Sequence, residues 1–228
     1  MFGRIAHRYD IANRCLSMGC DLYWRRQLCR KLASRHPESI LDLACGSGDV
    51  SLSLAKQLPA PTNITGMDFC EPMLERARQR WAGCKRKDDQ PRLEFLWGDA
   101  LQLPLSDDSQ DAVTIAFGLR NFEDRLRGLR EIARVLKPGG KLYVLEFTQP
   151  DRWFRPLYYL YLKCLLPPLA SLITGDRHAY YYLAGSIESF PDRYHLSLML
   201  EEAGYAEVTF TAMTFGIVAL HEATKKEI

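Results

Sequence analysis

The sequence predicts an α/β fold with a doubly wound, mostly parallel sheet. Two observations carry this prediction. Short apolar runs alternate along the chain with segments whose apolar residues recur at helical spacing. A glycine-rich turn, residues 46–48, stands where the first apolar run gives way to a helical segment. Strands that alternate with helices are typical of parallel sheets, and 228 residues fit a single domain, 1–228.

The expected strands are short apolar runs bounded by polar, Gly or Pro residues: 39–44, 63–68, 92–97, 111–117 and 141–147. The expected helices are 4–35, with a break near 17–19, then 49–57, 71–81 and 123–136. Pro138, Gly139 and Gly140 end the last of these helices. We expect the N-terminal helices, residues 1–35, to form a lid, and residues 151–190 to form a helical cap insertion for the substrate.

The composition argues against several classes of protein. The formal net charge of +2 is close to balanced, so there is no electrostatic case for a nucleic acid partner. The seven cysteines contain no C-x-x-C pair, and no histidine sits at zinc-finger spacing. We therefore expect no metal site, and reduced thiols in a cytoplasmic protein. No apolar stretch follows Met1, so no secretory signal is expected.

The end of the first strand carries the first candidate site residues. They run from Asp42 at the strand to Gly46, Ser47 and Gly48 in the turn. Glycines let the backbone approach a ligand closely, and the helix that follows presents free backbone N–H groups. The dinucleotide pattern G-x-G-x-x-G is incomplete, because Ser51 stands where the third glycine belongs.

Acidic residues follow the next two strands. Asp68 can accept both hydroxyls of a ribose, and Asp99, beside Ala100, can accept an adenine amino group. Each feature has a plainer interpretation, since the glycines can form a tight turn, Asp68 a helix N-cap and Asp99 a loop turn. Their convergence favours binding, because the carboxyl ends of strands form the ligand crevice of open α/β sheets. Ala116, near the end of the fourth strand, joins the candidate cofactor-binding residues.

Longer blocks elsewhere make the chain similar to one family: 2–6, Tyr9-Asp10, 117–121, 137–140, 145–147, 181–183 and 216–221. With the strand-end motifs, they resemble the ubiquinone/menaquinone biosynthesis C-methyltransferases, a family of class I S-adenosylmethionine-dependent methyltransferases with a Rossmann-like fold. The resemblance runs from Phe2 to about Lys225, and Phe-Gly-Leu-Arg-Asn at 117–121 is its most specific element. The departures are Cys45 and Ser47 in the turn, Gln110 in place of Phe, and a loose match over 151–180.

The resemblance implies S-adenosylmethionine as cofactor and methyl transfer to a ring carbon of a prenylated quinol. The sulfonium methyl is a strong electrophile, so the protein must mainly hold both partners in line. A phenolic pKa near 10 means that the ring needs help to ionise at pH 7. Arg120 can stabilise the phenolate, and Asn121 can orient a ring oxygen or a water. The plainer interpretations are a salt bridge from Arg120 to Glu123 or Asp124, and a helix N-cap at Asn121.

The general base stays open among His178, His195 and His221, since histidine titrates nearest to neutrality. Tyr9 and Tyr182 could line a lid or a ring slot, and we assign them no catalytic role. Three rival functions are a nicotinamide-dependent dehydrogenase, a methyltransferase of a soluble phenolic or polyketide metabolite, and a non-catalytic cofactor-binding scaffold subunit.

Residues 153–163 raise the question of a membrane. The segment is rich in Trp, Tyr and Leu, and it contains Arg155 and Lys163. Aromatic residues beside cations suit a membrane interface, whereas a spanning helix wants about 20 residues with few or no charges. We expect reversible, peripheral contact with the inner face of the membrane. The alternatives are a buried cap and a homodimer contact.

Overall fold

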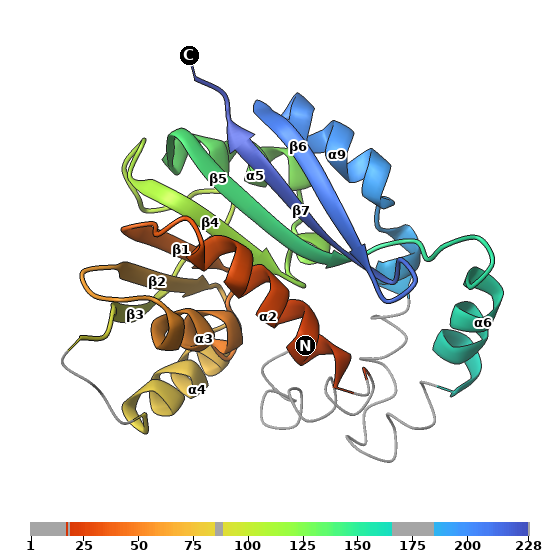
Figure 1. The fold of residues 1–228 in the computed structure, drawn as a ribbon, viewed down its shortest axis with the longest axis horizontal. Coiled ribbons are helices and arrows are strands. Elements are labelled where there is room, and N and C mark those ends of the chain that lie inside the picture. The colour runs from red at the N-terminus through yellow and green to blue at the C-terminus, as the bar shows by residue number, and fades with distance from the viewer. Residues whose placement is uncertain (1–16, 18, 85–88, 166–184, 228) are drawn as a thin grey trace.

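The computed structural model describes residues 17, 19–84, 89–165 and 185–227, and it is built on a seven-stranded sheet (Figure 1). The strands are β1 (Ser39–Leu43), β2 (Asn63–Asp68), β3 (Arg92–Trp97), β4 (Gln110–Ala116), β5 (Leu136–Phe147), β6 (Tyr205–Met213) and β7 (Val218–Lys225). Their order is β3-β2-β1-β4-β5-β7-β6. Strands β1 to β5 pair in parallel, and β7 runs antiparallel to both β5 and β6. The predicted α/β fold with a mostly parallel sheet is confirmed.

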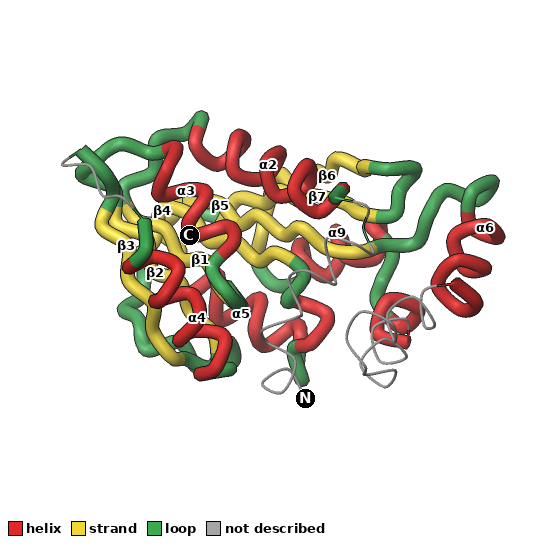
Figure 2. The backbone as a smooth tube through the Cα atoms, turned by 90° about the horizontal axis from the view of Figure 1, so that it is seen from below, coloured by secondary structure: helices red, strands yellow, loops and turns green. Residues whose placement is uncertain are grey.

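Helices cover both faces of the sheet, and α2 and α5 lie on opposite sides of it (Figure 2). The helices are α2 (Cys20–Ala33), α3 (Asp49–Gln57), α4 (Glu71–Ala82), α5 (Arg125–Val135) and α9 (Arg193–Glu202). The pleat of β5 shows how the two layers arise. Tyr143 and Leu145 pack with α2 and α3, while Leu142 and Val144 pack with α5 and α9. Alternate side chains of one strand therefore serve two cores, as expected for a doubly wound sheet.

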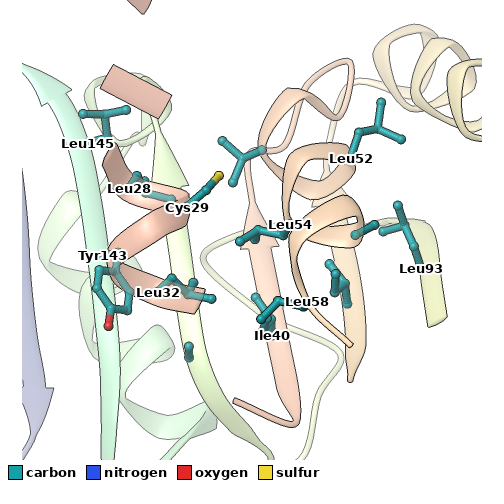
Figure 3. Close-up of a cluster of buried hydrophobic side chains, with 14 of the residues drawn as sticks. Leu28, Cys29, Leu32, Ile40, Leu52, Leu54, Leu58, Leu93, Tyr143 and Leu145 are labelled. Atoms are coloured by element: carbon teal, nitrogen blue, oxygen red, sulfur yellow. The ribbon is translucent and has the colours of Figure 1, made fainter. Parts of the chain in front are cut away.

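Helix α2 belongs to the core, and the lid that the sequence predicts over residues 1–35 stays a prediction. Leu28 and Leu32 of α2 are buried beside Ile40 of β1 and Leu54 of α3 (Figure 3). Burying such side chains is worth about 1.5–3 kcal/mol each. Residues 1–16, which carry the rest of the predicted lid and Tyr9, lie outside the described residues.

Strands β6 and β7 and helix α9 are additions to the elements expected from the sequence. Strand β6 lies at the edge of the sheet, and between its buried ends, Tyr205 and Met213, its residues are partly buried or exposed. Helix α9 covers β6, and it starts where the Asp192 side chain accepts hydrogen bonds from Tyr194 N and His195 N at 3.0 and 2.9 Å. Pairing between β5, β7 and β6 thus completes the sheet beyond the last strand that the sequence predicts.

The cap region begins with a short helix, α6 (Arg155–Leu160), followed by one turn of π-helix at Tyr161–Leu165. Tyr158, Leu162 and Ile187 form its small core, which packs against Phe147 at the end of β5 and against Ile217. Residues 166–184, which include His178 and Tyr182, lie outside the described residues. Within the described part of the chain, no helix is both long enough and apolar enough to cross a membrane.

Candidate active site

A cavity of about 600 Å³ opens at the carboxyl ends of the parallel strands. Loops after β1, β2 and β3 line one side of it with Gly46, Ser47, Asp68 and Asp99. The end of β5 and the cap region line the other side with apolar and aromatic side chains: Phe147, Phe154, Tyr158, Leu162 and Ile187. The volume lies in the range of small-molecule sites, and the position is where open α/β sheets bind ligands.

Asp68 accepts hydrogen bonds from residues of three loops on the polar side of the cavity. One carboxylate oxygen accepts a hydrogen bond from Gly46 N and the other from Cys70 N, each at 2.8 Å. The Asp68 carbonyl accepts a third, from Gly98 N, at 3.1 Å. Burial raises the pKa of the Asp68 carboxyl, while the hydrogen bonds from Cys70 N and Gly46 N act to lower it. Asp68 is not the N-cap of α4, because Cys70 holds that position.

The backbone is strained where β1 and β4 end. Ala44 has a φ of 52° and Phe117 a φ of 61°, both in the left-handed region that residues with a side chain rarely adopt. Both residues line the cavity. A side chain at Gly118 would bring its Cβ to 2.5 Å from Ala44 Cβ, so the two loops lie in direct contact. Such strain collects at ligand sites, because the surrounding fold must hold it.

Two of the predicted cofactor-binding residues lie behind the cavity instead of lining it. Gly48 has a φ of 81°, and a Cβ there would meet the Phe95 ring at 2.9 Å and Ala77 at 3.1 Å. Its glycine therefore serves helix packing and the turn, which corrects the expectation that it brings the backbone to the ligand. Gly46, with a φ of 56°, does line the cavity, as does Ser47.

Asp42 is the other residue behind the cavity, and it is fully buried under the loop. Its carboxylate accepts hydrogen bonds from Ser51 N at 2.9 Å, from the Ser51 hydroxyl, and from the Thr114 hydroxyl at 2.8 Å. Burial raises the pKa of Asp42 to about 6. We therefore assign Asp42 a positioning role: it joins the start of α3 to β4 beneath the glycine-rich turn.

The other predicted residues on the polar side do line the cavity. Asp99 lies there with Ala100, and its carboxylate accepts a hydrogen bond from Leu101 N at 2.9 Å, so the predicted loop turn exists as well. Ala116 lines the cavity at the end of β4.

Arg120 lies on the cavity wall in a 3-10 turn, Leu119–Asn121, after β4. Its Nη1 donates to Glu146 Oε1 at 2.7 Å and to the Phe117 carbonyl at 2.6 Å. The same Glu146 carboxylate accepts hydrogen bonds from Arg120 N at 3.3 Å and Phe147 N at 2.9 Å. The predicted salt bridge therefore exists, but its partner is Glu146 of β5, not Glu123 or Asp124. A local sequence pattern misses this partner because it lies on the neighbouring strand.

Asn121 also lines the cavity, and the helix after it starts at another residue. Asp124 is the N-cap of α5, where its side chain accepts a hydrogen bond from Arg127 N at 3.0 Å. The alternative role of Asn121 as an N-cap is therefore wrong.

Two of the three candidate histidines lie away from the cavity. His195 is exposed and lies 2.8 Å from Asp192, while His221 is buried and contacts the Arg193 carbonyl at 2.8 Å. Burial lowers the pKa of His221. The structure thus gives neither histidine a place from which to act as a base on a ligand in the cavity.

Sequence reasoning missed a group of three aromatic side chains that line the cavity. The rings of Trp24, Phe117 and Phe147 pack together, with centroids 4.9 to 6.2 Å apart. The Arg25 guanidinium lies over Phe117 at 5.1 Å, and that of Arg120 lies over Phe147 at 5.4 Å. The sequence signal is the Trp-Arg-Arg run on one turn of α2, which becomes informative once α2 is placed on the sheet.

Comparison with known proteins shows which family the chain belongs to. A family model described as the ubiE/COQ5 methyltransferase family matches residues 1–225. The chain belongs to this family. The enzyme is accordingly a methyltransferase of the S-adenosylmethionine-dependent type, and the predicted resemblance is confirmed.

Similar proteins cover nearly the whole enzyme. A demethylmenaquinone methyltransferase of Thermus thermophilus is 46% identical over 224 residues, which cover 97% of this chain and 98% of that protein. One of Clavibacter sepedonicus is 45% identical over 226 residues, covering 99% and 89% of the two chains. A crystal structure of a methyltransferase of Thermotoga maritima superposes with a TM-score of 0.68 at 20% identity, covering 99% and 98%. At that identity the likeness shows the fold alone, and the fold agrees.

Proposed function

We propose that the enzyme transfers a methyl group from S-adenosylmethionine to a ring carbon of a prenylated quinol, of the demethylmenaquinol kind. The observation that carries the proposal is the shape of the cavity. One space joins the polar loops after β1, β2 and β3 to the aromatic side at β5 and the cap region, with Arg120 between them. The similar proteins named demethylmenaquinone methyltransferases support the choice of a naphthoquinol ring.

The polar side fits the nucleoside of the cofactor. A carboxylate has about four acceptor positions, and Gly46 N and Cys70 N use two of those on Asp68, so ribose hydroxyls can use others. Asp99 and Ala100 line the cavity on the same side as Asp68, which supports a role in binding the adenine edge. Phe69, exposed and on the cavity wall next to Asp68, offers an apolar face to the base.

The chemistry needs a ring carbon made nucleophilic by ionisation of its neighbouring hydroxyl. When bound, the cofactor supplies an electrophilic methyl group, so the chain has to hold the ring in line and stabilise negative charge on its oxygen. Arg120 carries a positive charge into the cavity, and its partner Glu146 prevents free movement of the guanidinium. Asn121 follows Arg120 on the cavity wall, where its amide can orient the ring oxygen or a water.

The aromatic side fits the quinol ring and the first part of its prenyl tail. Phe147, Phe154 and Tyr158 line it, and burial raises the pKa of Tyr158, so this tyrosine stays neutral. A tail of the prenyl type is most stable against such surfaces, at about 25 cal/mol for each Å² removed from water.

The outer rim of this side supports the proposal of peripheral membrane contact. Phe154 and Leu157 line the cavity, and Phe154 packs with the exposed rings of Trp153 and Phe215 at centroid distances of 5.4 and 5.0 Å. A prenyl tail lies in the bilayer, so an apolar rim at the cavity mouth would let the quinol enter without crossing water. A dimer contact through the same rim is the competing outcome.

A panel of ring substrates tests the proposed function. Methyl transfer would be measured on demethylnaphthoquinol and demethylbenzoquinol rings with and without a prenyl tail, and on a soluble polyphenol. We expect the largest kcat/KM for a prenylated naphthoquinol. A larger kcat/KM for the soluble phenol would overturn the proposal in favour of a soluble metabolite.

A further inference from the structure

We propose that Arg25 of α2 binds the α-carboxylate at the methionine end of the cofactor, held in place for this by Asp49. The inference rests on the proposed function, because it assumes S-adenosylmethionine in the cavity. Arg25 carries none of the motifs that point to the cofactor in the sequence. Its assignment comes from the position of its guanidinium.

Arg25 reaches the cavity from the core helix. Its neighbour Trp24 donates a hydrogen bond from Nε1 to the Thr214 hydroxyl at 2.8 Å, which ties this turn of α2 to the loop between β6 and β7. The Arg25 guanidinium then lies over Phe117 at 5.1 Å, on the cavity wall. Both contacts hold the cation at the strand-end loops and limit the entropy lost when it binds an anion.

The hydrogen-bonding capacity of Arg25 is incompletely used by the described part of the chain. Its Nε lies 3.9 Å from Asp49 Oδ2, close enough for attraction but too far for a hydrogen bond. That Nε atom is buried and has no hydrogen-bond partner among the described residues. A buried donor without a partner is costly, so a ligand oxygen that reaches it is favoured.

Asp49 is engaged from its other side by Arg80. Arg80 Nη2 lies 2.8 Å from Asp49 Oδ1, and Arg80 Nη1 donates to the Ser47 carbonyl at 2.7 Å and the Ser47 hydroxyl at 3.1 Å. Asp49 is the first residue of α3, so the pair with Arg80 fixes the glycine-rich turn and the carboxylate together. The orientation of Asp49 then keeps Arg25 beside the turn.

Charge in the cavity points to the same residue. Of the described residues on its wall, Arg25 and Arg120 carry the positive charges. Arg120 has the Glu146 carboxylate at 2.7 Å. The amino-acid end of the cofactor brings a carboxylate, and a guanidinium is the side chain best shaped to bind one. Arg25 lies beside Asp49 at the glycine-rich turn, whereas Arg120 lies over the Phe147 ring at the end of β5.

A coupling experiment tests the assignment. Calorimetry would measure binding of S-adenosylhomocysteine and of its decarboxylated analogue to the wild type, Arg25→Gln and Arg25→Lys. In the wild type, loss of the ligand carboxylate should weaken binding about tenfold or more, the range for a charge-assisted hydrogen bond. In Arg25→Gln the affinities for the two ligands should lie within about threefold of each other. In Arg25→Lys the difference in affinity should lie between those of the wild type and Arg25→Gln. Arg26→Ala, an exposed neighbour on α2, is the matched control and should behave as the wild type.

The outcomes separate the inference from the function on which it rests. If Arg25→Gln weakens both ligands equally, Arg25 acts on the fold and the assignment is wrong. If Arg25→Gln does not fold, the wild type and Arg25→Lys still decide, because equal affinity of the wild type for both ligands overturns the assignment. If the wild type binds neither ligand, the cofactor site itself is wrong. Normal coupling without methylation of any quinol would leave Arg25 assigned and refute the proposed substrate.

Discussion

Arg120 Nη1 lies 2.7 Å from Glu146 Oε1, and the two side chains are 3% and 1% exposed. The pair joins the turn after β4 to β5 at the point where the polar and aromatic sides of the cavity meet. A buried charge without its partner costs about 3–5 kcal/mol, whereas replacing both partners by apolar side chains is often neutral. Stability and chemistry at Arg120 are therefore separable by experiment.

The first prediction concerns Arg120 in turnover. Arg120→Ala should keep affinity for S-adenosylhomocysteine and lower kcat by about 10²-fold or more per folded molecule, because a stabiliser of the developing charge is lost. Arg120→Lys should restore a part of the activity. Single-turnover assays measure the rate of methyl transfer, and circular dichroism shows that each variant is folded. Normal turnover per folded molecule would reduce Arg120 to a structural residue.

The second prediction concerns the stability of the same pair. Arg120→Ala should unfold at lower denaturant concentration by an amount worth about 3 kcal/mol, because Glu146 is left as an unpaired buried charge. The double variant Arg120→Met with Glu146→Leu should regain most of that stability and stay inactive. Denaturant titrations measure the free energy of unfolding of each variant. A double variant as unstable as the sum of the two single changes would show that no coupling exists between the residues.

The third prediction concerns Asp68. Asp68→Ala should weaken binding of S-adenosylhomocysteine by about 1.5–3 kcal/mol, because charge-assisted hydrogen bonds to the ribose are lost. Asp124→Ala is the matched control: it removes an exposed helix cap, should cost about 1 kcal/mol of stability, and should leave binding unchanged. Calorimetry measures the affinity of each variant for S-adenosylhomocysteine. Unchanged affinity in Asp68→Ala would show that this residue does not bind the cofactor.

The fourth prediction uses the pKa of Asp42, which burial raises from 3.8 to about 6 in the folded state. The folded protein then binds more protons than the unfolded chain between these values, so the Asp42 contribution to stability is present below pH 4 and is lost as pH rises through about 6. The loss is up to about 3 kcal/mol over this window. Asp42→Asn lacks the titration, so the difference in unfolding free energy between wild type and variant should fall over that range. A difference that is flat with pH would contradict the shift.

The fifth prediction concerns the rim of the cavity. Replacing Trp153 and Phe154 by Ser should reduce partitioning onto anionic liposomes and activity on long-tailed quinols, while activity on a short-tailed analogue survives. Trp153 is 69% exposed, and the control Leu198→Ser changes an apolar side chain on α9 that is 60% exposed but not at the cavity. Membrane contact would be refuted if the wild type does not bind liposomes and has the same activity on long-tailed and short-tailed quinols. Formation of a dimer that depends on protein concentration would support a dimer contact through the rim.

The sequence patterns predicted the parallel strands, because β1, β2, β4 and the second half of β5 are runs of mostly buried residues. In β3, buried and exposed residues alternate, which is the other common pattern of a strand. The same patterns missed β6 and β7. Strand β6 lies at an edge, and its identity comes from pairing with β7 instead of from its own apolar residues. Lys137 to Gly140 end the preceding helix as expected, but Leu136 already pairs with Gln110, so β5 begins before the turn.

In the site, too, some residues could be predicted from the sequence and others could not. Residues that follow strand ends, such as Asp68, Asp99 and Arg120, could be found in the sequence, because topology alone brings strand ends together. Glu146 and Arg25 could not be assigned this way. Their roles depend on which strand neighbours β4 and on which face of α2 meets the cavity. Asp42 and Gly48 are the converse, since they belong to the motif but pack behind the cavity.

The central claim is carbon methylation of a prenylated quinol, and one labelling measurement tests it most directly. The enzyme would be supplied with S-adenosylmethionine carrying a ¹³C methyl group and with a prenylated demethylnaphthoquinol kept reduced. The product would be analysed by NMR. We predict one label per product, bonded to a ring carbon. Label on a ring oxygen, or no label in the quinol while a soluble phenol is methylated, would contradict the account.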